Sequence, residues 1–187
     1  MAEQVNGYRT LLLPQYDTYN HWREYALTHG VNVDWNFGNQ CWDICALLWF
    51  QYGLRLETGN GYAYGCYALK RDINARFPFS KVERRVDIKR GDCLVFAPSG
   101  LNYTGHICFA DEDYISGMTY IKCLGQNQGQ GTGWGTPSNI ANINSRTFLG
   151  GFRNHNWQTP EPPQPLQTKK SNFPFVLYAK KLRNPNL

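Results

Sequence analysis

Hydrophobic residues recur at helical spacing near the start of this chain. Between residues 18 and 29, Tyr19, Trp22 and Tyr25 stand among polar residues at intervals of three. Residues three and four apart lie on one face of a helix, so this spacing predicts an amphipathic helix. Gly30 follows as a stop signal, and we therefore predict the first helix over 18–29.

The next apolar stretch is almost uninterrupted. It runs over Ile44–Phe50, begins three residues after Cys41, and ends before Gly53. This length and composition predict a second helix that begins near Cys41 and is buried on most sides. A third helix is predicted over 64–77, because Pro78 would end it.

Short apolar runs bounded by turn residues follow in the second half of the chain, and they predict strands at 93–97, 106–110, 119–124 and 147–153. Helices followed by short strands indicate an α+β domain, with N-terminal helices packed on a short antiparallel β-sheet. The segment 125–135 is rich in Gly and Gln and predicts a mobile loop beside a site.

The chain of 187 residues is long enough for one compact domain. We place that domain at 1–157, because the composition changes abruptly afterwards. Residues 158–172 are rich in proline and predict a stiff, extended linker. Residues 173–187 form an apolar extension that either docks on a partner or returns as a strand to its own domain.

The charge of the chain is modest. A formal net charge of +5 and nineteen scattered Lys and Arg residues indicate mild attraction to a polyanion such as a cell wall. A nucleic-acid binder would show basic clusters with exposed aromatic residues, so we expect no nucleic-acid partner. We expect no membrane insertion, because no segment is apolar for long enough, and Met1–Gly7 does not resemble the start of a signal peptide.

Six cysteines occur, at positions 41, 45, 66, 93, 108 and 123, without a CxxC pair. Most lie in apolar segments, so we expect reduced, buried thiols rather than a disulfide framework or a metal cluster. Cys41 differs because it opens a predicted helix. Unpaired N–H groups and the helix dipole at that end favour a thiolate, which is the nucleophilic form of cysteine.

A cysteine nucleophile needs a base and a group that orients the base. Among four histidines, His106 stands out because it opens a predicted apolar strand, where its side chain can face a cleft. Alternation after the strand 119–124 places residues 125 and 127 on one face. Asn127 is therefore predicted to accept a hydrogen bond from the imidazole of His106.

Four segments together resemble the signature of the cysteine- and histidine-dependent amidohydrolase/peptidase (CHAP) domains of phage lysins and bacterial wall enzymes. In this chain they are Gly38–Asp43, Gly91–Phe96, Gly105–Ile107 and Leu124–Asn127. The similarity extends over about 17–157. It implies a papain-like α+β fold that cleaves amide bonds in peptidoglycan.

The resemblance also implies roles for single residues. Cys41 would attack the carbonyl, His106 would act as the base, and Asn127 would orient the imidazole. Helix-start N–H groups, helped by Gln40, would stabilise the oxyanion. Many phage members have glutamate where this chain has Gly125, which leaves Asn127 as the orienting group and questions the strength of the base.

Some members of the family bind calcium before the nucleophile. The corresponding candidates in this chain are Asn32, Asp34, Asn36 and Asp43. Calcium takes six to eight oxygen ligands and usually several carboxylates, and this segment offers two. The alternative is that Asp34 and the asparagines are turn and helix-cap residues. We therefore expect no required cofactor, with calcium as a candidate.

The expected function is that of a phage peptidoglycan hydrolase, either an N-acetylmuramoyl-L-alanine amidase or a cross-link endopeptidase. A tail-associated lysin is favoured, made in the host cytoplasm without a signal peptide and carried at the tail tip, with tail proteins as partners through 173–187. The alternatives are an inactive structural or plug protein of a tail, an endolysin released at lysis, and a papain-like hydrolase of proteins.

Overall fold

The structure is a computed structural model that describes residues 2–5, 8–11, 18–33, 38–51, 79–129 and 136–157. The predicted third helix at 64–77, linker at 158–172 and apolar extension at 173–187 lie outside the described residues. These three features stay predictions.

Two α-helices occur where the sequence predicts them. Helix α1 spans Tyr19–Thr28, and the hydroxyl of Thr18 caps it by accepting a hydrogen bond from the His21 N–H at 3.2 Å. Helix α2 spans Cys41–Gln51. Among the described residues, no helix is both long and apolar enough to cross a membrane.

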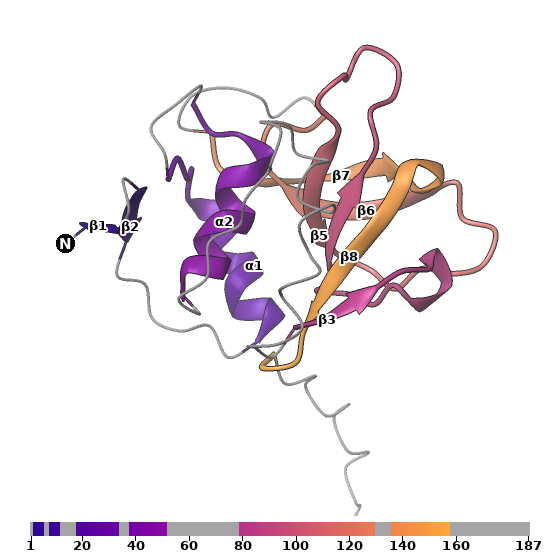
Figure 1. The fold of residues 1–187 in the computed structure, drawn as a ribbon, viewed down its shortest axis with the longest axis horizontal. Helices are drawn as coiled ribbons and strands as arrows, with labels where there is room; N and C mark the ends of the chain where they lie inside the picture. The colour runs from indigo at the N-terminus through magenta and orange to yellow at the C-terminus, as the bar shows by residue number, and fades with distance from the viewer. Residues whose placement is uncertain are drawn as a thin grey trace, which may run out of the picture.

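The strands form two antiparallel sheets. Strands β1 (Ala2–Val5) and β2 (Tyr8–Leu11) make a small hairpin. The main sheet contains β3 (Phe79–Val82), β4 (Cys93–Phe96), β5 (His106–Ala110), β6 (Tyr120–Gly125), β7 (Asn139–Asn144) and β8 (Phe148–Asn154). Its strand order is β3-β8-β4-β5-β6-β7, and all neighbours run antiparallel (Figure 1). Short 3₁₀ turns occur at Arg85–Asp87 and Ser145–Thr147.

The observed elements confirm the predicted α+β class. The four predicted strands correspond to β4, β5, β6 and β8, with ends that differ by one residue at most. Strands β3 and β7 were not predicted. They complete the two edges of the main sheet, where each of them pairs with one neighbour.

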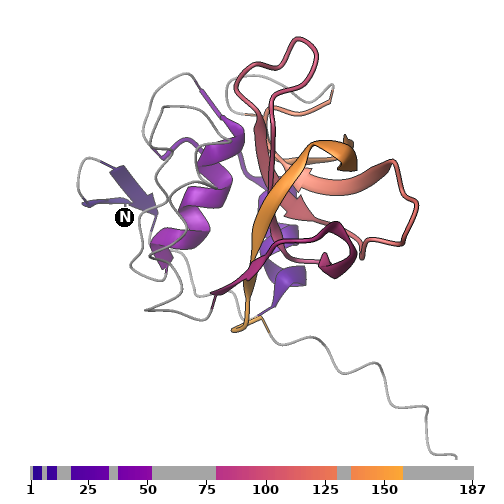
Figure 2. The same ribbon diagram turned by 45° about the vertical axis from the view of Figure 1, so that its right-hand side comes forward.

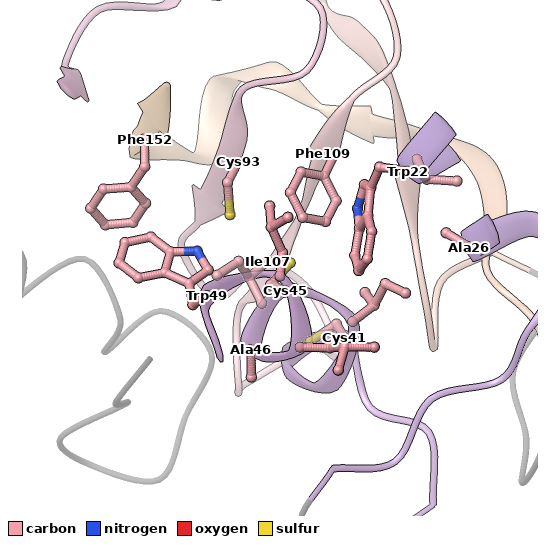
Figure 3. Close-up of a cluster of buried hydrophobic side chains, with 14 of the residues drawn as sticks. Trp22, Ala26, Cys41, Cys45, Ala46, Trp49, Cys93, Ile107, Phe109 and Phe152 are labelled. Atoms are coloured by element: carbon pink, nitrogen blue, oxygen red, sulfur yellow. The ribbon is translucent and has the colours of Figure 1, made fainter. Parts of the chain in front are cut away.

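Both helices pack on one face of the sheet (Figures 1 and 2). Trp22 of α1 meets Phe109 edge-on at 6.0 Å between ring centroids, and Trp49 of α2 meets Phe152 at 5.0 Å. Figure 3 shows these side chains in the cluster between the helices and the sheet. This packing fixes the start of α2 against the sheet.

Strand β5 contributes to two clusters because its side chains alternate between the faces of the sheet. Ile107 and Phe109 belong to the cluster beneath the helices, whereas Cys108 and Ala110 belong to a second cluster. Every residue of β5 is buried. The strand is therefore a rigid support for His106 at its first position.

Candidate active site

The start of α2 is held by the side chain of Asp43, which is fully buried. One carboxylate oxygen accepts a hydrogen bond from the Gln40 N–H at 2.7 Å, and the other accepts one from the Val33 N–H at 2.8 Å. An acidic side chain in the first turn that bonds back to the residue before the helix is one half of a capping box. Asp43 thus fixes the backbone that leads into Cys41.

Cys41 is the first residue of α2, and its side chain is buried. The pKa of the thiol is raised from 9.0 to about 11, mainly by burial and to a smaller extent by the charge of Asp43. The backbone N–H groups of Ile107 and Trp42 lower this pKa, but by less than burial raises it. The expectation that the helix start makes Cys41 a thiolate is therefore wrong for this structure, because desolvation outweighs the helix N–H groups.

The other cysteines of the described residues are also buried. Together with Cys41 there are five free thiols among the described residues, the other four being Cys45, Cys93, Cys108 and Cys123. Cys45 lies one turn beyond Cys41 on α2, and burial raises its pKa well above 9.0. The prediction of reduced, buried thiols is confirmed for these five, while Cys66 lies outside the described residues.

His106 opens β5, the strand against which α2 packs. The backbone N–H of its neighbour Ile107 is close enough to the Cys41 thiol to lower the pKa of that thiol, so Cys41 lies beside the start of β5. The ring of His106 itself is hydrogen-bonded to Gln128. Burial lowers the pKa of His106 below 6.5, and a hydrogen bond with Gln128 opposes that effect. The imidazole is therefore neutral at pH 7.

The orienting residue differs from the predicted one. His106 Nε2 lies 2.7 Å from Oε1 of Gln128, whereas Asn127 donates from Nδ2 to Gln40 Oε1 at 2.9 Å. Strand β6 ends at Gly125, and Asn127 has a positive φ of 49°. This left-handed turn breaks the alternation on which the Asn127 prediction rested.

The segment that follows β6 is a fixed part of the site. Gln126 accepts from the Val31 N–H at 2.8 Å and donates to the carbonyls of Val31 at 2.8 Å and Gln40 at 3.1 Å. Gln126 is 1% exposed and Gln128 is 4% exposed. The prediction of a mobile loop is therefore wrong for 126–128, because buried carboxamides with several hydrogen bonds hold it in place.

Gln40 lies directly before the nucleophile and is partly buried. Its backbone is held at both ends, because the N–H donates to Asp43 and the carbonyl accepts from the Asp43 N–H at 3.1 Å. Its side-chain oxygen accepts from Asn127. The carboxamide of Gln40 therefore has a fixed direction beside Cys41.

The four calcium candidates are only partly described. Asp34 and Asn36 lie outside the described residues. Asn32 Oδ1 is buried without a hydrogen-bond partner, while both oxygens of Asp43 already accept backbone N–H groups. Among the described residues, no group of three or more His, Cys, Asp or Glu side chains could hold a metal. The two described candidates, Asn32 and Asp43, do not by themselves supply the six to eight oxygens of a calcium site.

Comparison with known proteins relates this fold to phage enzymes. No family model matches the chain. Over 121 residues, or 62% of the chain, it is 29% identical to the D-alanyl-L-alanine endopeptidase of Streptococcus phage B30. The chain spans 26% of that protein.

Solved structures show a related fold. The wild-type endolysin LysIME-EF1 resembles this structure with a TM-score of 0.58 at 21% identity, over 74% of this chain and 64% of that one. Ly7917 gives a TM-score of 0.48 at 12% identity, over 74% of this chain and 63% of its own. The chain thus spans less than two thirds of either structure, and the likeness to LysIME-EF1 supports the fold.

Proposed function

We propose that this protein hydrolyses an amide bond of bacterial peptidoglycan, with Cys41 as the nucleophile and His106 as the general base. The observation that carries the proposal is the placement of a thiol at the start of α2, which packs on β5 and brings the thiol beside the N–H of Ile107, the residue after His106. The similarity to a phage endopeptidase supports the substrate class.

The first step forms an acyl-enzyme. The Cys41 thiol gives its proton to His106, and the sulfur attacks the carbonyl carbon of the substrate amide. The C–N bond then breaks, and the proton held by His106 passes to the leaving amine. The Cys41 thiol and the His106 imidazole are both neutral in the resting protein. The proton therefore moves to His106 as the sulfur attacks, and no stable thiolate–imidazolium pair forms beforehand.

The second step releases the acyl group. His106 takes a proton from water, and the remaining hydroxide adds to the thioester carbon. The C–S bond breaks, the carboxylic acid leaves, and the proton returns from His106 to the Cys41 sulfur. Thiol and imidazole thus return to their initial state.

Negative charge on the carbonyl oxygen needs hydrogen-bond donors in both steps. The backbone N–H of Cys41 at the start of α2 is one candidate, because the first residue of a helix has no preceding helical carbonyl to which it can donate. The Gln40 carboxamide is a second candidate. Asn127 holds its oxygen, which directs the side chain as a whole.

The biological setting is part of the proposal. We favour a tail-associated lysin whose segment 173–187 binds phage tail proteins, and the alternative is an endolysin released at lysis. Mass spectrometry of purified phage particles separates them. Detection of the chain in particles supports the first, and its presence only in the lysate contradicts it.

A catalytically inactive tail protein with the same fold is the second candidate function. The observation that favours it is the burial of Cys41, which is 8% exposed and has a pKa of about 11. A thiol in this state is a weak nucleophile until a base removes its proton. Activity on wall substrate decides between the two candidates.

Mass analysis of digested muropeptides tests the proposal and identifies the bond. Purified streptococcal walls, chosen because the relative comes from a streptococcal phage, are incubated with the protein. An endopeptidase separates cross-linked peptides that stay on their sugars, whereas an amidase detaches whole peptides from the glycan. The relative's name favours the endopeptidase. Walls that release neither product would contradict the proposed function.

A further inference from the structure

Three consecutive carboxamides follow β6, and each contacts a different part of the site. Gln126 binds the backbone of Val31 and Gln40, Asn127 binds the side chain of Gln40, and Gln128 binds His106. We call residues 126–128 the carboxamide segment. The positive φ of Asn127 sends neighbouring side chains in different directions, so one short segment can serve both the nucleophile and the histidine.

The orientation of the Gln128 carboxamide follows from its surroundings. Its Nε2 donates to the Cys123 carbonyl at 2.8 Å and to the Asn139 carbonyl at 2.9 Å. Carbonyl oxygens only accept, so a flipped carboxamide would place oxygen against oxygen at both positions. Oε1 is therefore the atom that faces His106, and β6 and β7 hold it there.

A fixed acceptor determines where the imidazole carries its hydrogen. His106 Nε2 lies 2.7 Å from that oxygen and is buried with it, so Nε2 must be the N–H donor. We infer that Gln128 is the positioning residue of His106, and that it fixes the tautomer with hydrogen on Nε2 and leaves Nδ1 as the basic nitrogen. The catalytic meaning of this inference rests on the proposed function.

Gly125 provides the space that Gln128 uses. A Cβ atom at residue 125 would lie 2.8 Å from Gln128 Oε1 and 2.9 Å from the Cβ of Cys108. Both distances are too short for a side chain, so only glycine allows the carboxamide to reach His106 from this direction. The contact between Gln128 and His106 therefore depends on Gly125, because residue 125 has no side chain to occupy the space of the Gln128 carboxamide.

With hydrogen on Nε2, the atom of His106 that can act as the general base is Nδ1. The Cys41 proton would go to Nδ1 of His106, while Nε2 keeps its bond to Gln128 throughout the reaction. Because the carboxamide is neutral, Gln128 contributes orientation and a hydrogen bond but no charge. Its neighbour Asn127 donates to Gln40 instead of contacting the imidazole.

The tautomer of the unmodified protein tests the inference directly. We would label the full chain with ¹⁵N-histidine and record imidazole nitrogen shifts at pH 7, identifying His106 by the signals lost in H106N. The expected result is a protonated Nε2 and an unprotonated Nδ1. Hydrogen on Nδ1, or a mixture of both tautomers, would overturn the inference.

Two neighbouring variants separate positioning from general structural support. Q128M keeps the length of the side chain but removes its hydrogen bonds, so His106 should populate both tautomers. We expect kcat on wall substrate to fall roughly tenfold to a hundredfold with KM little changed, because the base is misplaced. N127G keeps the backbone turn, removes the neighbouring carboxamide, and should leave the His106 tautomer as in the unmodified protein.

The outcomes keep this inference distinct from the proposed function. A Q128M protein that retains both the single tautomer and kcat would overturn the role of Gln128 while the hydrolase stands. Absence of wall activity in the unmodified protein would count against the function, and the tautomer would still decide whether Gln128 positions His106. Thermal unfolding shows whether Q128M is folded, and Q128A replaces it if it is not.

Discussion

At the scale of single residues, burial determines the protonation of the candidate catalytic pair. A low-dielectric surrounding disfavours charge, so it raises the pKa of the Cys41 thiol and lowers the pKa of His106. Both side chains are therefore neutral in the resting protein at pH 7. Catalysis by such a neutral pair would depend on a well-oriented base. Gln128 matters for this reason, because its hydrogen bond holds the imidazole of His106 in place.

The first prediction concerns the reactivity of Cys41. Its alkylation by iodoacetamide should still accelerate as the pH rises toward about 11, because only the thiolate reacts. Mass spectrometry of the peptide that contains Cys41 measures the rate at each pH, with glutathione as an unburied control thiol. A rate that levels off below pH 9 would mean that the helix start outweighs burial.

The second prediction concerns stability against pH. The folded-state pKa of His106 lies below its ordinary value of 6.5. Below pH 6.5 His106 is protonated in the unfolded chain but stays neutral in the folded protein until a lower pH. The free energy of unfolding should therefore fall from pH 7 to pH 5. One group contributes at most about 1.4 kcal/mol per pH unit.

Urea unfolding at pH 7 and pH 5 measures this effect, and H106N is the control because asparagine does not titrate. The unmodified protein should lose more stability on acidification than H106N does. Equal losses in both proteins would show that His106 is not held neutral by the fold.

The sequence allowed Cys41 and His106 to be chosen because their positions depend on local signals. Each stands at the first residue of an apolar element, and both elements form as predicted. Gln128 could not be chosen the same way, because its contact with His106 depends on the turn at Asn127 and on the space beside Gly125. A polar run that ends in Asn-Gln-Gly was the only available sign of that turn.

At the scale of elements, the start of α2 depends on Asp43. Its two carboxylate oxygens bond the N–H groups of Val33 and Gln40, which lie on the segment that leads into the helix. Loss of these bonds would release the backbone around Cys41. Asp43 therefore has a structural role at the start of α2, whereas the sequence suggested it only as a calcium ligand.

The third prediction follows from this cap. D43N should lower the free energy of unfolding by about 1–3 kcal/mol, because the amide nitrogen would face a backbone N–H and leave a buried donor without an acceptor. Chemical denaturation measures the change. D87N is the control, because Asp87 pairs with Arg84 at the surface and its loss should change little. Equal stability of D43N and the unmodified protein would contradict the capping role.

The elements themselves differ in how well sequence predicts them. Helices α1 and α2 and strands β4, β5, β6 and β8 have apolar runs with clear stop signals, so their positions could be predicted. Strand β7 could not, because its sequence Asn-Ile-Ala-Asn-Ile-Asn lacks alternation and its residues are mostly half-buried. Such an edge strand forms through pairing with β6 rather than through its own pattern.

At the scale of the whole molecule, packing brings the site together from three distant parts of the chain. Helix α2 lies against β5, and the carboxamide segment connects β6 to the residues before the helix. The positions of Cys41 and His106 therefore depend on one shared core. The α+β class followed from the order of helices and strands, but the joining of these parts by residues 126–128 needed the structure.

The fourth prediction concerns calcium. Asp43 uses both oxygens on backbone N–H groups, so its contribution to stability does not need a metal. Removal of calcium with a chelator, followed by its return, should leave the Tm unchanged. A rise of more than about 4 °C on adding calcium would correspond to over 1 kcal/mol of binding and would contradict this expectation.

The central claim is that Cys41 is the nucleophile of a wall hydrolase. The measurement that tests it most directly compares release of soluble muropeptides from purified peptidoglycan by the unmodified protein, C41A and C45A. Cys45 is the matched control, since it is a buried thiol one turn along the same helix. We predict release by the unmodified protein and C45A and none by C41A, whereas release by a folded C41A protein would contradict the claim.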